Sequence, residues 1–370
     1  MTILPVEGLF GGVDREFAVE ELTSIINNVP NQFGLVSQMN IFPMAPPLST
    51  TFFKVERNNW TLNLLPITER GASGTMGRVG KRDVKVFEVP QITHQDQVTV
   101  ADIQNLRLWG PMAPKMMEDA MSDKLATMAR KHFQTHEWHN ITMLRGQMRD
   151  ADNGIVLDVF SQFGIVQGVT AFGHAGMAID TRYRSIKRYI ELNLRGETMT
   201  RVCALCSPEY MEFLFTDATI KTAYNQAMAA HAAMVAVNPT LNDQRFGWVF
   251  NDVIHYEYIG AAPVLNSDGT ETVRTFVPAG EAIFFPLGTT EAAHSYIAPG
   301  DFEESVNMPG QLFYAKEERG EFGRSRQILT QSNRLPLWKK PALLVKATIL
   351  NTAPGSGASG NNIGQNGSLL

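Results

Sequence analysis

The sequence predicts an α+β fold, on three observations. Residues 35–67 and 83–90 are rich in β-branched and aromatic residues and flank a glycine-rich loop, which predicts a long β-hairpin. A helical pattern runs from Met116 to about Leu144. From Thr198 onward, strand patterns alternate with helices, and the chain closes with strands.

The composition is that of a folded chain with no marked preference for a charged partner. Its 370 residues are 44% hydrophobic and 19% charged, and the net charge of −5 provides no basic field for nucleic acid. The two cysteines cannot staple a chain of this size. Residues 1–20 lack the basic region of a signal peptide, and no apolar run is long enough to span a membrane. We therefore expect an intracellular, soluble protein.

The N-terminal part is expected to be extended. Residues 17–31 predict one short helix that ends before Pro30. At about 3.3 Å per residue, hairpin strands of roughly 14 residues would reach about 45 Å. A two-stranded hairpin of that length needs a surface beneath it.

The helix predicted over 116–144 would be a rod about 40 Å long. One face carries Leu125, Met128, Ala129, His132, His136, His139 and Met143 at helical spacing. Trp138 and Ile141 lie on the opposite side. Large residues on both faces predict a helix that other elements contact from more than one side.

The remaining elements follow from local signals. Asn153-Gly154 marks a hairpin turn within 149–164, and Ser207-Pro208 is a helix start with serine as N-cap. We expect helices at 177–194, 209–224 and 225–237, strands at 200–206, 281–288 and within 323–350, and a hairpin that joins 248–261 to 272–278 through Asp268-Gly269. Residues 351–370 have the composition of a flexible tail.

The loop GASGTMGRVGKR (71–82) has glycine at every third position: Gly71, Gly74, Gly77 and Gly80. It lacks the spacing and the Ser/Thr of a phosphate-binding loop, and it opens a strand rather than a helix. Five basic residues lie in the loop or beside it: Arg70, Arg78, Lys81, Arg82 and Lys85. Two interpretations remain, a surface tip without a partner and a flexible basic tip that binds an acidic partner surface.

His132, His136 and His139 could present three imidazoles to a metal ion. However, the H-E-W-H stretch departs from the H-E-x-x-H pattern, and no carboxylate is paired with it elsewhere, so packing and hydrogen bonding are the favoured role. Cys203 and Cys206 have no second pair for zinc, and Cys203 precedes the helix start, so we expect core cysteines.

No catalytic constellation is recognisable, because serine-hydrolase and dinucleotide motifs are missing and the acidic residues are scattered. An extended arm and a projecting hairpin expose backbone and apolar groups that a neighbouring chain would cover. These features predict a self-assembling subunit.

Five segments in order carry a resemblance to a known family: 6–43, 67–110, 123–146, 200–215 and 325–350. Through them, about residues 5 to 350 resemble the major capsid proteins of tailed bacteriophages, of the lambda-like capsid protein E family. The resemblance implies an HK97-like phage capsid fold. It places an N-terminal arm at 1–36, an extended loop at 37–97, a spine helix at 116–145, a peripheral domain at 98–199 plus 311–350 and an axial domain at 200–310. It does not explain the tail at 351–370.

The same resemblance implies a non-enzymatic shell protein without a cofactor, which forms hexamers and pentamers of an icosahedral head around double-stranded DNA. The basic residues of the loop tip would contact a neighbouring subunit, and the four glycines would act as hinges. Scaffolding, decoration and portal proteins are further expected partners, without a membrane. The protein would reside in the virion, and in the host cytoplasm during assembly. Two alternatives stay open, an encapsulin-type nanocompartment shell and a metal-dependent enzyme that uses the three histidines.

Overall fold

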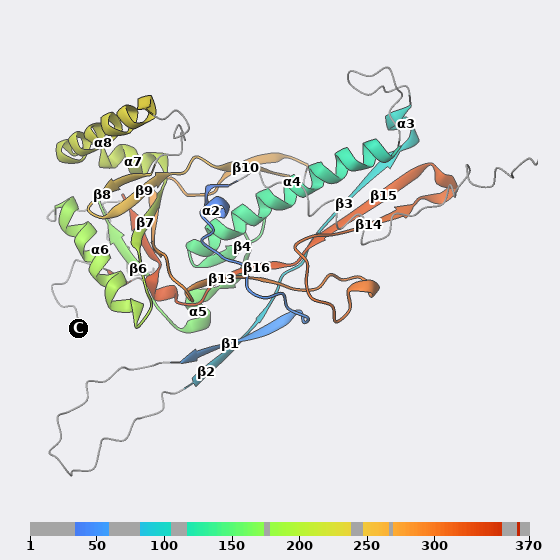
Figure 1. Ribbon diagram of the computed structural model, residues 1–370, viewed down its shortest axis with the longest axis horizontal. Coiled ribbons are helices and arrows are strands. Elements are labelled where there is room, and N and C mark those ends of the chain that lie inside the picture. The colour runs from blue at the N-terminus through green and yellow to red at the C-terminus, as the bar shows by residue number, and fades with distance from the viewer. Residues whose placement is uncertain are drawn as a thin grey trace, which may run out of the picture.

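Helix α4 (Met117–Leu144) lies along a three-stranded antiparallel sheet in the computed structural model (Figure 1). The structure describes residues 34–58, 82–104, 117–173, 178–237, 247–265, 269–349 and 361–362. The sheet has the order β14 (Tyr314–Arg319), β15 (Ser325–Ser332) and β3 (Ile92–Thr99), and α3 (Val100–Ile103) follows β3. The helix predicted over 116–144 is confirmed.

Both sides of α4 are buried, as its sequence predicted. Met128 and Leu125 pack with Val98, Phe313 and Ile328 in a small core between the helix and the sheet. Trp138, Ile141, Met143 and Leu144 belong to the larger core of the molecule. The hairpin β4 (Gln147–Arg149) and β5 (Ile155–Asp158) follows, with Asn153 in the left-handed region at φ 67°, and leads into α5 (Val159–Phe163).

A mixed seven-stranded sheet forms the other main part of the molecule, on the left of Figure 1. Its order is β18 (Asn361–Asn362), β6 (Gly168–Ala171), β17 (Val345–Thr348), β12 (Glu281–Leu287), β7 (Arg201–Cys206), β9 (Val253–Glu257) and β8 (Trp248–Phe250). The central strands β7 and β12 are buried on both faces. Helix α6 (Ile179–Leu194) packs on the sheet through Tyr183, Ile186 and Ile190.

The helix start at Ser207 is confirmed, because the Ser207 hydroxyl accepts a hydrogen bond from Tyr210 N. The predicted break after Tyr224 is wrong. Helix α7 (Pro208–Leu214) ends ten residues earlier, and α8 (Ala218–Val237) runs through Tyr224. Asp217 starts α8 by accepting a hydrogen bond from Ile220 N at 3.3 Å, and no helix-breaking residue occurs at 224–225.

The hairpin predicted from 248–261 to 272–278 is two hairpins. Strand β8 turns into β9 through Asn251 and Asp252, whose φ angles of 50° and 64° are those of a tight hairpin turn. Strands β10 (Ala261–Leu265) and β11 (Glu271–Thr275) then pair as a separate two-stranded sheet. The prediction was therefore right for the second turn and missed the first.

The described part of the N-terminal region is attached to the body. After α2 (Leu35–Gln38), the chain lies beside β13 (Ala293–Ile297), where Ala45 N and Leu48 N donate to the carbonyls of Ser295 and Ile297 at 2.9 Å. Strand β13 pairs with β16 (Arg334–Trp338). Short 3-10 turns occur at Glu303–Ser305, Glu321–Gly323 and Pro341–Leu343.

The boundaries that the resemblance implies cross three of these sheets, one of which pairs β13 of the axial range with β16 of the peripheral range. The seven-stranded sheet joins β6 and β17, assigned to the peripheral domain, to β12, β7, β9 and β8, assigned to the axial domain. Strand β3, which spans the end of the extended loop, pairs with β15 over eight residues. The helix predicted over 17–31 and most of the tail lie outside the described residues. Within the described residues, no helix is long and apolar enough to cross a membrane.

Candidate assembly surfaces

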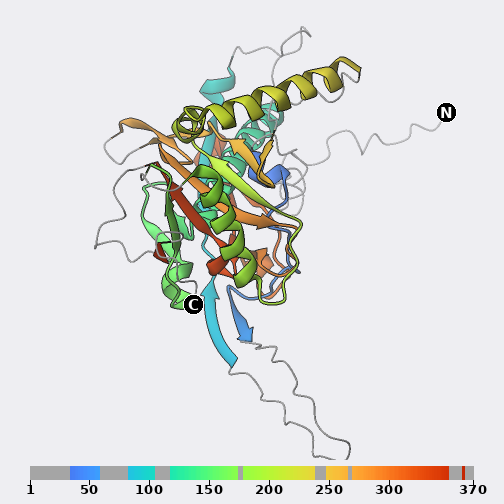
Figure 2. The same ribbon diagram turned by 90° about the vertical axis from the view of Figure 1, so that its left-hand side faces the viewer.

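The hairpin of β1 (Phe52–Asn58) and β2 (Arg82–Glu88) projects from the body (Figures 1 and 2). The strands are antiparallel, with Phe53 opposite Phe87 and Val55 opposite Lys85. The predicted hairpin is confirmed for these seven pairs. Its further extent lies in residues 59–81, outside the described part of the chain.

One face of the hairpin is fixed to the body by aromatic packing. Phe53 stacks on Tyr296 with ring centroids 3.9 Å apart, and Phe87 packs on Phe163 at 5.8 Å. Phe53, Val55 and Phe87 are all buried. These contacts hold the root of the hairpin on the body and set the direction in which it projects.

The opposite face is solvent-exposed and carries three large apolar side chains. Phe52 is 52% exposed, Val84 46% and Val86 57%. Because side chains alternate along a strand, these residues share one face of the two-stranded ribbon. We call this set, Phe52, Val84 and Val86, the outer hairpin face. Apolar residues gathered on a projecting ribbon are typical of a surface that another protein covers.

The structure places only part of the predicted basic tip. Arg82 is the first residue of β2, and Lys85, half-buried, lies opposite Val55. Arg70, Arg78 and Lys81 lie outside the described residues, as do Gly71, Gly74, Gly77 and Gly80. Their contacts with a neighbouring subunit stay a prediction.

A second feature is the buried contact between the N-terminal segment and α4. Glu137 is only 1% exposed and accepts hydrogen bonds from Val36 N at 2.9 Å and Ser37 N at 3.0 Å, at the start of α2. The hydroxyls of Ser37 and Tyr258 also donate to it, at 2.5 and 3.3 Å. The carboxylate thus binds the segment that leads to residues 1–33.

The sequence analysis did not predict that Glu137 binds another segment of the chain. A signal existed, because Glu137 lies four residues after Phe133 and four before Ile141, both of which are buried. An acid on a buried helix face predicts a specific partner. Arg334 is buried nearby, and burial lowers the pKa of its guanidinium to about 10 although the charge of Glu137 opposes the shift.

Two of the three histidines of α4, His132 and His136, contact β15. His132 Nε2 lies 3.0 Å from Thr330 Oγ1, and the Ser332 hydroxyl lies 3.0 Å from both His132 Nδ1 and His136 Nε2. Burial lowers the pKa of His132 and His139 to about 4 and that of His136 well below its usual 6.5. Packing and hydrogen bonding, the favoured role, is confirmed for His132 and His136. Among the described residues, no group of three or more His, Cys, Asp or Glu is arranged to hold a metal ion.

The two cysteines are core residues, as expected. Cys203 and Cys206 are fully buried in β7 and form no disulfide. Burial raises the pKa of both thiols, so neither is activated as a nucleophile or redox group.

Comparison with known proteins identifies what the chain resembles. The family model described as "Phage major capsid protein E" matches residues 18–349. The major capsid protein of Pseudomonas phage KPP10 is 27% identical over 350 residues, which cover 90% of this chain and 97% of the relative. The major capsid protein of Salmonella phage Felix O1 is 23% identical over 47% of this chain and 48% of its own.

The fold is shared with a solved structure. A crystal structure of an E. coli CFT073 prophage protein, assigned as its capsid protein, superposes with a TM-score of 0.54 at 13% identity. The superposition covers 91% of this chain and 100% of that one. The HK97-like capsid fold implied by the sequence resemblance is confirmed.

Proposed function

The chain belongs to the phage major capsid protein E family, and from this premise we propose how it builds a shell. It is a major capsid protein of a tailed phage and therefore a component of the virion. We propose that copies assemble into hexamers and pentamers of an icosahedral head, in the host cytoplasm, around double-stranded DNA. Scaffolding, decoration and portal proteins are the further partners of this proposal.

The observation that carries the proposal is the outer hairpin face. The ribbon is anchored through Phe53 and Phe87, while Phe52, Val84 and Val86 face solvent on a projection from the body. In a shell of repeated heterologous contacts, this face lies against the next subunit and is buried. The resulting contact is made once by every copy, so a modest free energy per contact stabilises the whole shell.

The basic tip adds charge to the same contact. Arg70, Arg78, Lys81 and Arg82 would meet acidic groups of the neighbour, and each exposed pair would contribute about 0–1 kcal/mol. Lys85 lies half-buried opposite Val55, on the face of the ribbon that packs on the body. The glycines Gly71, Gly74, Gly77 and Gly80 would let one sequence adopt different backbone angles at non-equivalent positions of the shell. The net charge of −5 suits a wall that encloses DNA without binding it tightly.

The test is electron microscopy and analytical ultracentrifugation of the full chain, expressed alone and with its scaffolding protein. We expect closed shells or capsomers, and DNA inside particles isolated from infected cells. A strictly monomeric product under both conditions would contradict the proposal. Purified shells that hold a protein cargo instead of DNA would support the nanocompartment alternative.

A further inference from the structure

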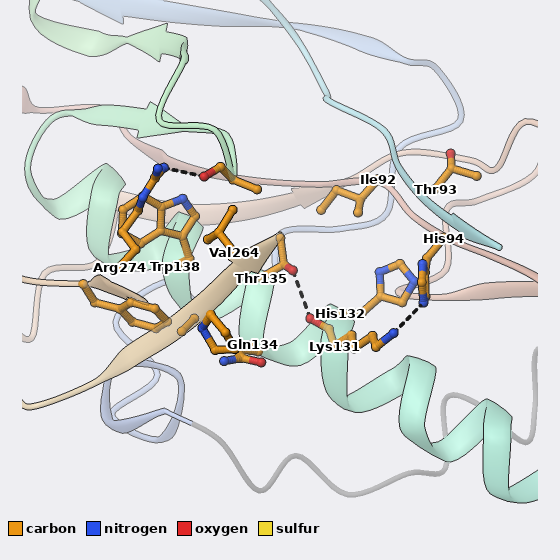
Figure 3. A pocket seen from close by; sticks show the side chains of 14 residues that line it. Ile92, Thr93, His94, Lys131, His132, Gln134, Thr135, Trp138, Val264 and Arg274 are labelled. Atoms are coloured by element: carbon orange, nitrogen blue, oxygen red, sulfur yellow. Dashed lines mark hydrogen bonds between the residues drawn. The ribbon is translucent and has the colours of Figure 1, made fainter. Parts of the chain in front are cut away.

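A half-open groove lies between α4 and the hairpin β10–β11 (Figure 3). Its volume is about 470 Å³. Trp138 of α4, Val264 of β10 and Phe276 form apolar walls, and Ile92 of β3 lies toward its other end. A groove of this size and lining accepts several apolar side chains of a peptide segment.

The groove is also electropositive. Lys131 and Arg274 are among the residues that line it, and none of the fourteen lining residues is acidic. Lys131 Nζ lies 3.1 Å from His94 Nε2, and Arg274 Nη1 donates to the carbonyl of Ala151. Asp96, on the same strand as His94, pairs with Lys124 instead. The groove therefore favours a ligand that combines apolar side chains with carboxylates.

The chain itself contains a segment with this chemistry. Residues 1–33, outside the described part, carry five acidic residues and one basic residue: Glu7, Asp14, Glu16, Glu20, Glu21 and Arg15. Within the helix predicted over 17–31, Glu20 and Glu21 lie three and four residues after Phe17 and so share its face. One face of such a helix would thus offer the apolar ring of Phe17 beside two carboxylates.

We propose that the groove between α4 and β10–β11 binds the acidic amphipathic segment at residues 14–26 of a neighbouring copy. Phe17 enters between Trp138 and Phe276, and Glu20 and Glu21, on the same helical face, lie near Lys131 and Arg274. The proposal rests on the self-assembly proposed above and adds a second contact to it, separate from the hairpin.

The position of the arm favours a neighbour over the same chain. The N-terminal segment leaves the body at Gly34, beside Glu137. The chain that leads into β10 passes this point, since Tyr258 bonds Glu137, and only then reaches the groove with Val264. The helix predicted over 17–31 ends before Pro30, so residues 30–33, about 14 Å of extended chain, would have to connect it to Gly34. A neighbour's arm meets no such restriction.

Cross-linking of assembled full-length chains tests the contact directly. One set of copies carries Leu22→Cys and the other carries Gln134→Cys, at a residue that lines the groove. The native Cys203 and Cys206 are fully buried and so do not react with a maleimide. After co-assembly and a short bismaleimide treatment, we expect a heterodimer band. A chain with both substitutions should give a ladder of linked chains.

Three results would overturn the proposal. A double variant that links only within one chain would place the arm in its own groove. A Gln134→Cys copy that links to Arg78→Cys instead would make the hairpin tip the occupant. No link at all would show that the arm does not occupy the groove. Arg130→Cys, exposed and one residue from the groove-lining Lys131, is the matched control and should not link.

Charge reversal gives an independent test. Lys131→Glu should lower the yield of shells at least tenfold, and Glu20→Lys with Glu21→Lys in the same chain should restore it. Arg130→Glu should leave the yield unchanged, and thermal unfolding should show that all variants are folded. Shells at wild-type yield from Lys131→Glu would refute the proposal while leaving the shell function intact. Failure of the wild-type chain to assemble would instead contradict the proposed function.

Discussion

The carboxyl group of Glu137 occupies the space that a side chain at residue 34 would need. A Cβ built on Gly34 would lie 2.2 Å from Cδ of Glu137, and the φ angle of Gly34 is +89°. Both the close approach and the left-handed backbone therefore require glycine. This contact joins the start of α2 to the C-terminal third of α4 across 100 residues of sequence.

Gly34→Ala should weaken the attachment of the N-terminal segment. Alanine adds about 1–2 kcal/mol of backbone strain and a steric conflict with Glu137, so we expect a loss of about 2–4 kcal/mol in urea unfolding, or faster proteolysis near α2. Gly196→Ala is the control, because Gly196 has φ +85° and open space around it. Equal losses in the two variants would show that the contact with Glu137 carries no energy.

Glu137→Gln should preserve the shape of the site and remove its charge. The hydrogen bonds from Val36 N and Ser37 N weaken, and the buried Arg334 loses the nearby negative charge. We therefore expect the free energy of unfolding, measured by chemical denaturation, to fall by about 2–3 kcal/mol. Glu191→Gln on the exposed side of α6 should change stability by less than about 0.5 kcal/mol. An unchanged Glu137→Gln variant would contradict the anchoring role.

Acidification should destabilise the subunit before its carboxylates titrate. Burial lowers the pKa of His132, His139 and His255 from 6.5 to about 4 in the folded chain. The unfolded chain therefore binds more protons, so this stability is present above pH 6.5 and is lost as the pH falls toward 4. Burial raises the pKa of Glu197, but hydrogen bonds from Lys340 and Thr290 outweigh it and lower the pKa to about 2, so its contribution changes only below pH 4.5.

Denaturation midpoints at pH 7, 6 and 5 would measure this dependence. Each buried histidine contributes a slope of up to about 1.4 kcal/mol per pH unit. His132→Gln should make the slope shallower by about that amount. A stability that stays constant from pH 7 to pH 5 would show that these histidines take up protons as readily in the folded protein as in the unfolded chain.

Removing the apolar outer hairpin face should impair assembly without unfolding the subunit. Val84→Ser with Val86→Ser replaces two exposed side chains, so the free energy of unfolding should change by less than about 1 kcal/mol while shell yield in electron micrographs falls. Val306→Ser, 63% exposed elsewhere on the surface, should assemble normally. Equal yields from the two variants would exclude this face from the contact.

Reversing the charge of the hairpin tip tests its electrostatic role. The triple variant with Arg78→Glu, Lys81→Glu and Arg82→Glu should block or weaken shell assembly, because like charges would face the acidic partner surface. The melting temperature of the unassembled subunit should stay the same. Particles of wild-type yield and stability from this variant would refute electrostatic docking of the tip.

Local signals determined where most elements begin and end. The helix at Met117–Leu144, the cap at Ser207 and the turn at Asn153 follow from residue types within a few positions, and each is confirmed. The misplaced helix break at Tyr224 is instructive, because Asp217 was a stronger local signal and was overlooked. The turn at Asn251 and Asp252 was also missed. It too had a local signal, because asparagine and aspartate tolerate the left-handed region.

The sequence by itself determined the class of the fold, the hairpin, the long helix with two buried faces and, through its resemblance, the family. Only the tertiary structure decided what those buried faces contact: that β7 pairs with β9 in parallel, that His132 meets Thr330, and that Glu137 binds the start of α2. Periodicity reports which side of a helix or strand is buried, but not the partner. The partners lie up to about 200 residues away, and they are selected by packing and hydrogen-bond geometry in three dimensions.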